Sequence, residues 1–257
     1  MGGFYFDSSA RSALGLVRSG NEDSAFVSER LIAVADGMGG HAGGEVASKI
    51  AIRTLQSLTP LLTDSTIDSD STDDLLLKTL HTIDTEIGEY ARESIDLRGM
   101  GTTLTLLLVR NDKIALVHVG DSRCYRLSEN IFEQLSSDHT VVQELLDQGA
   151  ISEIEATDHP QRSVLTQALM GEGNIVPIVQ LFDAKENDRY LLCSDGLTGV
   201  LTDKEIKSIL KKSDKEVAIK ALVDATYIQG APDNVTILIA DVTRDAVSIN
   251  QLLGAAQ

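Results

Sequence analysis

Acidic residues recur at the ends of short apolar runs in this chain. Asp36 directly follows the run LIAVA. Asp195 follows the run YLLC with one serine between them, and Asp233 precedes the run VTILIADV with one asparagine between them. Such runs are typical of buried strands, and a glycine after the acid lets the backbone turn sharply. The chain is therefore expected to carry carboxylates at several strand ends, from which they can point into one shared pocket.

The order of strand-like and helix-like segments favours an α+β fold. From residue 101 the pattern changes to short strands separated by turn residues, which predicts an antiparallel meander. Strands and helices are grouped and do not alternate, so we expect an antiparallel sheet core flanked by helices. No repeat or linker divides the chain, and residues 1–257 are predicted to form one domain. The expected elements are a strand at 31–35, a helix at 45–58, a mobile acidic loop at 63–74, a helix at 75–90, the meander at 101–135, helix and loop at 138–170, strands at 175–181 and 189–193, helices at 202–211 and 215–227, and a strand at 235–242.

Charge and composition restrict the partners. The net charge of −17 would repel nucleic-acid phosphates and anionic lipid headgroups, so we expect neither a nucleic-acid partner nor membrane contact. No stretch reaches the ~18 consecutive apolar residues of a membrane span, and the N-terminus lacks a secretory signal. Cys124 and Cys193 lie in apolar stretches, which fits core residues in a reducing compartment. These features predict a cytoplasmic protein, and we expect a monomer.

The carboxylates form a candidate metal site. Glu22-Asp23 in RSGNED and Asp121 in HVGDSR add to the three strand-end aspartates. Crowded carboxylates repel one another unless a cation neutralises them, and an all-oxygen ligand set suits Mg²⁺ or Mn²⁺ better than Zn²⁺. The alternative is that Asp-Gly merely forms turns, because that dipeptide is common in them.

Such a site suits phosphate chemistry. Two cations a few Å apart can bridge one water, lower its pKa and neutralise charge on a phosphoryl group. Arg18, in the segment LVRSGNED, can supply a bidentate fork for the phosphate of the substrate. The sequence therefore indicates hydrolysis of a phosphate monoester.

Seven motifs together resemble one known family. In chain order they are RSGNED, ADGMGGHAGGE, GMGTTL, HVGDSR, SDHT, SDGL and DNVT. This set is similar to the bacterial branch of the type 2C (PPM) metal-dependent protein serine/threonine phosphatases, over about residues 10–242. The resemblance implies a central sandwich of two antiparallel β-sheets flanked by α-helices, in an α-β-β-α arrangement. It also implies hydrolysis of phosphoserine and phosphothreonine in proteins without a covalent intermediate, in opposition to bacterial serine/threonine kinases.

The resemblance further implies roles for matching positions. Arg18 matches the phosphate-binding arginine, and residues 138–170 match a flap beside the active site that influences which phosphoproteins dock. The implied ligands of two Mn²⁺ or Mg²⁺ ions are Asp36 bridging both, the carbonyl of Gly37, Asp195 and Asp233 at the first ion, and Glu22 or Asp23 at the second through water, with Asp121 and Asp195 at a third position.

One position departs from the eukaryotic members. Met38 stands where those members have a histidine proposed as general acid. His41 is one candidate for protonating the leaving group, and a water on the metal is the other. His139 and His159 of the flap are interpreted as structural.

Other functions fit less well. The stretch GMGGHA satisfies a dinucleotide-binding pattern, but a meander follows where a second parallel strand should come. Neither cysteine has an arginine six positions on, as a cysteine-dependent phosphatase needs. A catalytically silent phosphoprotein-binding module would be expected to lack metal aspartates, and all are present. We expect the chain to be either a free-standing enzyme or a catalytic domain of a longer protein.

Overall fold

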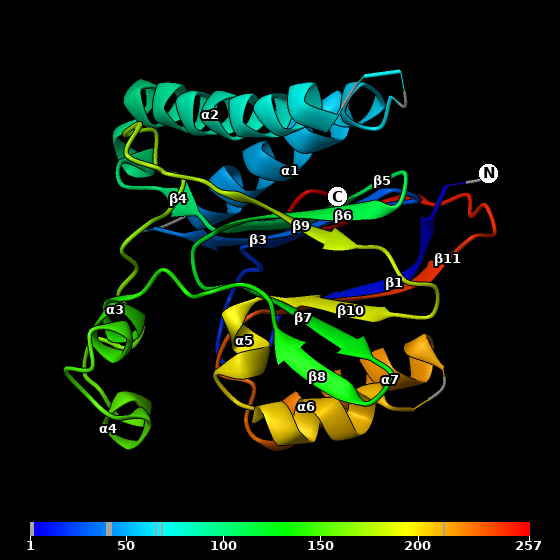
Figure 1. Cartoon of the computed structure of the whole chain (residues 1–257). Coiled ribbons are helices and arrows are strands. Elements are labelled where there is room, and N and C mark those ends of the chain that lie inside the picture. The colour runs from blue at the N-terminus through cyan, green and yellow to red at the C-terminus, as the bar shows by residue number, and fades with distance from the viewer. Residues whose placement is uncertain (1–2, 40–42, 65, 68, 213) are drawn as a thin grey trace.

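Two antiparallel sheets lie face to face, with helices on both outer faces (Figure 1). The structure is a computed structural model, and it describes residues 3–39, 43–64, 66–67, 69–212 and 214–257. One sheet has the strand order β12 (Asn250–Gly254), β2 (Asp23–Ser28), β3 (Leu31–Met38), β5 (Leu104–Arg110), β6 (Lys113–Val119) and β9 (Val179–Asp183), with β4 (Gly101–Thr102) beside β3. The other has the order β1 (Tyr5–Ala13), β11 (Val235–Thr243), β10 (Arg189–Cys193), β7 (Arg123–Ser128) and β8 (Ile131–Gln134).

The helices cover both faces of this sandwich. Helices α1 (Gly43–Leu62) and α2 (Ser69–Glu93) cover the seven-stranded sheet, and α6 (Asp203–Leu210) and α7 (Lys215–Ile228) cover the five-stranded sheet (Figure 1). The short helices are η1 (Ile95–Leu97), α3 (Val141–Asp147), α4 (Glu153–Thr157) and α5 (Asp195–Thr198). The predicted α-β-β-α sandwich is therefore confirmed.

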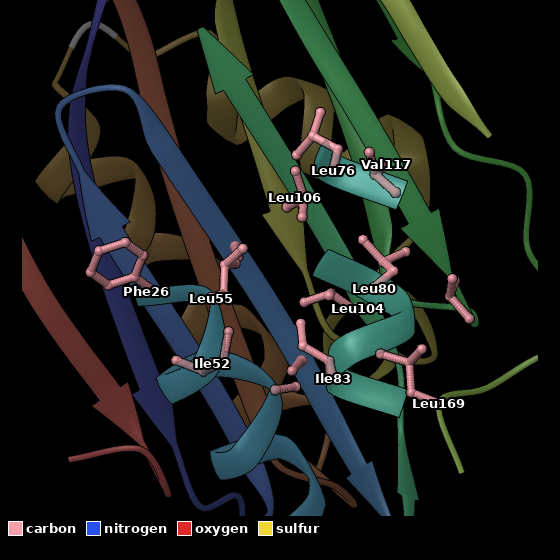
Figure 2. Close-up of a cluster of buried hydrophobic side chains, with 14 of the residues drawn as sticks. Phe26, Ile52, Leu55, Leu76, Leu80, Ile83, Leu104, Leu106, Val117 and Leu169 are labelled. Carbon is pink, nitrogen blue, oxygen red and sulfur yellow. The ribbon is translucent and has the colours of Figure 1, made fainter. Parts of the chain in front are cut away.

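Three apolar layers hold the sandwich together. Figure 2 shows part of the first, to which α1 contributes Ile52, α2 contributes Leu80 and β5 contributes Leu106. Between the sheets, alternate strand residues such as Leu107 point the opposite way and pack in the second layer. The third layer lies under α6 and α7. Strand β3 is buried on both faces, which explains why its sequence is a continuous apolar run.

Several predicted boundaries were wrong. The acidic stretch at residues 63–74 does not stay a loop, because α2 begins at Ser69. Aspartates in a first helical turn are stabilised by the positive end of the helix dipole, so the acidic composition suits a helix start. The strand predicted at 175–181 begins only at Val179, and β1, β2 and β12 were not predicted.

The meander is also divided between the sheets. Strands β5 and β6 belong to the seven-stranded sheet, whereas β7 and β8 belong to the five-stranded sheet. The chain crosses between them at Gly120, whose φ of +107° favours glycine. Asp121 therefore lies on the crossover between the two layers. Among the described helices, none is both long and apolar enough to cross a bilayer.

Candidate metal centre

Two of the predicted acids face each other across neighbouring strands. Asp23 begins β2, Asp36 lies near the end of β3, and the two are directly paired in the antiparallel register. Directly opposed side chains have Cβ atoms about 5 Å apart, and like charges at that separation destabilise a sheet. Asp23 is 1% exposed, so water does little to screen this repulsion.

The five-stranded sheet supplies two more acids to the same place. Asp195 opens α5 with one residue between it and β10, and Asp233 precedes β11 with one residue between them. A direct contact joins the two sheets here, because the Ser194 hydroxyl donates to Oδ2 of Asp23 at 2.8 Å. The same hydroxyl oxygen accepts the N–H of Thr236 at 3.0 Å.

Burial and neighbouring carboxylates raise the pKa of Asp36 and of Asp195. Burial first, and then the charges of Asp23 and Asp195, holds the pKa of Asp36 well above its ordinary value. Burial and the charge of Asp233 likewise raise the pKa of Asp195, and Asp36 lies near enough to act as its hydrogen-bond partner. Such charges act over short distances, so Asp23, Asp36, Asp195 and Asp233 share one neighbourhood.

Gly37 and Glu22 lie beside this group. The Gly37 N–H donates to the Glu22 carbonyl at 3.2 Å. A Cβ on Gly37 would lie 2.1 Å from the carbonyl oxygen of Gly44 and 2.5 Å from that of Glu22, so only glycine fits. Burial raises the pKa of the Glu22 carboxyl. The Gly37 position is thus fixed by close backbone packing.

Asp121 joins the group from the crossover between the sheets. Burial, followed by the charges of Asp195 and Asp138, raises its pKa. The crossover is bonded to the strand end that carries Asp36: the Ser122 hydroxyl lies 2.7 Å from the Thr103 hydroxyl, whose oxygen accepts the Asp36 N–H at 2.9 Å. The crossover and β3 therefore hold their acids in a fixed relation.

Arg18 lies at the exposed rim of the centre. Its Nη2 donates to Oδ2 of Asp233 at 2.6 Å, and its side chain is 49% exposed. Asn234 fastens the loop that carries Arg18, because its side-chain amide donates to the carbonyls of Leu14 and Gly20 at 2.8 and 3.0 Å. The arginine is thus held by Asp233 beside the acids, with one side facing solvent.

The donor set fits a hard divalent cation. All the gathered side chains offer carboxylate oxygens, the ligands that Mg²⁺ and Mn²⁺ prefer. Oδ1 of Asp23 is buried and no hydrogen bond reaches it, although Thr236 is near enough to lower the pKa of Asp23. Within the described ranges, however, no three His, Cys, Asp or Glu side chains already surround a single point as a cation cage. The acids are brought together without being preset as a coordination sphere.

Of the three predicted histidines, the two that the structure describes bond to other groups. His41 lies outside the described residues. His139 is bonded to the crossover, where its Nδ1 accepts the Gly120 N–H at 3.1 Å, and it stacks on His118. His159 caps a turn in the flap by accepting the Gln161 N–H. The contacts of His139 and His159 are with the protein's own backbone and rings.

Sequence reasoning missed the residues that support the acids. Ser194, Thr103 and Asn234 each bond an acidic segment from a distant part of the chain. The only available signal was that each lies inside a motif, SDGL, GTTL or DNVT.

Comparison with known proteins identifies the family. A family model described as protein phosphatase 2C matches residues 19–225. The serine/threonine protein phosphatase PstP of Mycobacterium tuberculosis is 42% identical over 236 residues, which are 91% of this chain and 44% of that protein. The serine/threonine phosphatase Stp of Listeria monocytogenes is 38% identical over 242 residues, covering 90% of this chain and 94% of that protein. The chain thus spans less than half the length of the first relative.

A solved structure agrees with these matches. The catalytic domain of PstP in complex with two manganese ions superposes with a TM-score of 0.84 at 38% identity, covering 93% of this chain and 99% of that chain. The phosphatase Stp1 of Staphylococcus aureus gives a TM-score of 0.85 at 32% identity, covering 92% and 94%. The chain therefore belongs to the protein phosphatase 2C family, and it is similar to that family's bacterial serine/threonine phosphatases.

Proposed function

We propose that this chain hydrolyses phosphoserine and phosphothreonine in proteins with the help of two divalent cations, Mn²⁺ or Mg²⁺. One observation carries the proposal: Asp23 and Asp36 are paired directly across two buried strands, with Asp195 close enough to perturb both. Burying like charges next to one another is energetically unfavourable unless a cation compensates them. The manganese-bound relative adds support, because its fold covers nearly the whole of this chain.

The ligand assignment follows the resemblance to the type 2C phosphatases. The proposed set for the two ions is Asp36 to both, the Gly37 carbonyl, Asp195 and Asp233 to the first, and Glu22 or Asp23 to the second through water, with Asp121 and Asp195 at a third position. Bound there, the cations would supply positive charge for the phosphoryl oxygens and a water of lowered pKa.

The chain's own groups would bind and orient the substrate. Arg18 has a planar fork that can hold two phosphate oxygens, and its exposed side faces arriving substrate. Its hydrogen bond to Asp233 would keep the guanidinium aimed at the acids. His41 remains our candidate for donating a proton to the departing seryl or threonyl oxygen.

The wider setting is part of the proposal. We take residues 1–257 as one catalytic domain that acts as a monomer on phosphorylated proteins in the cytoplasm, with a serine/threonine kinase as its counterpart. Cys124 and Cys193 are free and buried, which is compatible with a reducing compartment.

The test combines turnover with stability. Phosphothreonine-peptide hydrolysis should require Mn²⁺ or Mg²⁺ and stop in excess EDTA. Mn²⁺ at about 100 times its Kd should also stabilise the protein by about 2.7 kcal/mol, which is about 5–10 °C in Tm for a domain of this size. Asp36→Asn should lose both effects, with turnover down on the order of 100-fold or more.

Glu89→Gln is the matched control, since this exposed acid lies on α2 and should leave both readouts unchanged. Equal turnover in EDTA would refute the proposed chemistry. Normal Mn²⁺ stabilisation without turnover would instead indicate a silent binding module.

A further inference from the structure

The flap segment, residues 138–170, forms one wall of a groove at the acidic centre, which is the group of carboxylates that makes up the candidate metal centre. It leaves the sandwich after β8, carries α3 and α4, and projects from one end of the molecule (Figure 1). The groove has a volume of about 610 Å³. Its lining includes Asp121, Asp195 and Asp233 from the centre and Gln143, Glu153 and Thr157 from the flap. A polypeptide that presents a phosphoresidue to the acids would lie in this groove.

One ion pair joins the first residue of the flap to the crossover. Arg123 begins β7, and its Nε donates to both carboxylate oxygens of Asp138 at 2.9 and 3.0 Å. Its Nη2 donates to Oδ2 of Asp138 at 2.7 Å, so the contact is a fork on a carboxylate. The Asp138 side chain is only 10% exposed. Because of this burial, the pair is screened less than a surface ion pair.

All three nitrogens of the Arg123 guanidinium are hydrogen-bonded within the protein. Its remaining nitrogen, Nη1, donates to the Tyr125 hydroxyl at 3.1 Å, and that hydroxyl donates to Asp203 at 3.0 Å. Burial by itself would lower the pKa of Arg123, but the hydrogen bonds and charge of Asp138 raise it above the ordinary value. Arg123 lines the groove with every guanidinium nitrogen bonded to a protein group, which favours a role in placing other groups.

Backbone bonds extend this attachment to the whole root of the flap. The His139 N–H donates to the Gly120 carbonyl at 2.8 Å, and the Thr166 N–H donates to the His139 carbonyl at 2.9 Å. Thr140 and Leu165 form an isolated bridge. The two ends of the flap are therefore bonded to each other and to the turn that carries Asp121.

We propose that the Arg123–Asp138 ion pair is a positioning device that sets the distance between the flap and the acidic centre, and so fits the groove to a polypeptide substrate. The inference rests on the proposed function, since it concerns how that same site receives its substrate. Asp138 and Arg123 are positioning residues, because they act through the flap. Loss of the pair should impair the hydrolysis of phosphopeptides, because a peptide fills the groove. A small aryl phosphate, which needs only the acids and Arg18, should be little affected.

The experiment compares two substrates in matched variants. Asp138→Asn keeps the shape of the side chain but removes its charge. At saturating Mn²⁺, kcat/KM for a ten-residue phosphothreonine peptide should fall about 10-fold or more, mainly through KM, because a displaced flap loses binding contacts with the peptide. The values for p-nitrophenyl phosphate should change less than about 2-fold. Asp138→Glu, which retains the charge, should restore part of the peptide activity.

Glu133→Gln is the control. It breaks the neighbouring pair in the β7–β8 hairpin, in which Arg126 donates to Glu133 at 2.9 Å, and it should leave both substrates unchanged. Equal loss on both substrates in Asp138→Asn, or no loss on the peptide, would overturn the inference. If that variant does not melt cooperatively, Arg123→Lys carries the same comparison, since it keeps the charge and loses the fork. Absence of turnover by the unaltered protein on both substrates would reject the proposed function itself.

Discussion

Replacement of Asp84 by asparagine is expected to lower the free energy of unfolding by about 2–4 kcal/mol. Asp84 lies on α2 and is 3% exposed. Its Oδ1 accepts the N–H groups of Met170 and Gly171 at 2.9 and 2.8 Å, and its Oδ2 accepts that of Gly173 at 2.9 Å. One buried carboxylate therefore fixes the end of the flap to the helix layer.

The magnitude follows from the three bonds. A hydrogen bond to a charged group contributes about 1.5–3 kcal/mol net. Asparagine keeps one oxygen for Met170 and Gly171 at reduced strength, and it turns an NH₂ donor toward the N–H of Gly173. One bond is lost outright and two are weakened, which gives the stated range. For a domain of this size, Tm should fall by about 5–15 °C.

Urea unfolding followed by circular dichroism measures this change, with the slope m checked for constancy. Glu89→Gln, an exposed change on the same helix, should stay within about 0.5 kcal/mol of the unaltered protein. A value for Asp84→Asn inside that same interval would refute the reasoning, because the three N–H groups would then be equally well satisfied by water.

Four further substitutions test other contacts. Gly171→Ala should destabilise the fold severely, since its Cβ would lie 2.0 Å from the backbone of α2. A Cβ on Gly173 meets no atom within 4 Å, so Gly173→Ala should cost only about 1 kcal/mol for its left-handed backbone. Thermal melts compare the two variants. Ser194→Ala removes the 2.8 Å bond to Asp23 and should cost about 1–3 kcal/mol in urea unfolding. Burial, and then a neighbouring histidine, lowers the pKa of His118 to about 3. Below about pH 6.5 the unfolded chain therefore binds a proton at His118 that the folded chain does not bind, and the free energy of unfolding falls from there toward pH 3. In His118→Gln, Tm measured across this pH range should fall less steeply.

The sequence predicted the architecture where periodicity was strong. Strand β10 and helix α7 were placed within a residue or so, because apolar spacing is a local property. Strand β1 was missed because polar side chains interrupt its sequence YFDSSARSA. It forms through its full-length pairing with β11, more than 200 residues away, and no local pattern encodes such a partner.

The candidate site divides in the same way. The acids at strand ends could be predicted because each lies beside a recognisable run. Their supports could not, because each bond spans a long stretch of chain: 67 residues from Asp36 to Thr103, 171 from Asp23 to Ser194, and 212 from Glu22 to Asn234. The paired register of Asp23 and Asp36 likewise becomes visible only once β2 and β3 are aligned.

The placement of the acids at the ends of both sheets has a mechanical consequence. Asp36 belongs to the seven-stranded layer, whereas Asp195 and Asp233 follow and precede strands of the five-stranded layer. When ionised, these acids repel one another across the interface between the sheets, and this repulsion opposes the apolar packing there. Whatever compensates this charge also fastens the layers together, so occupancy of the centre and the rigidity of the sandwich should rise and fall in step.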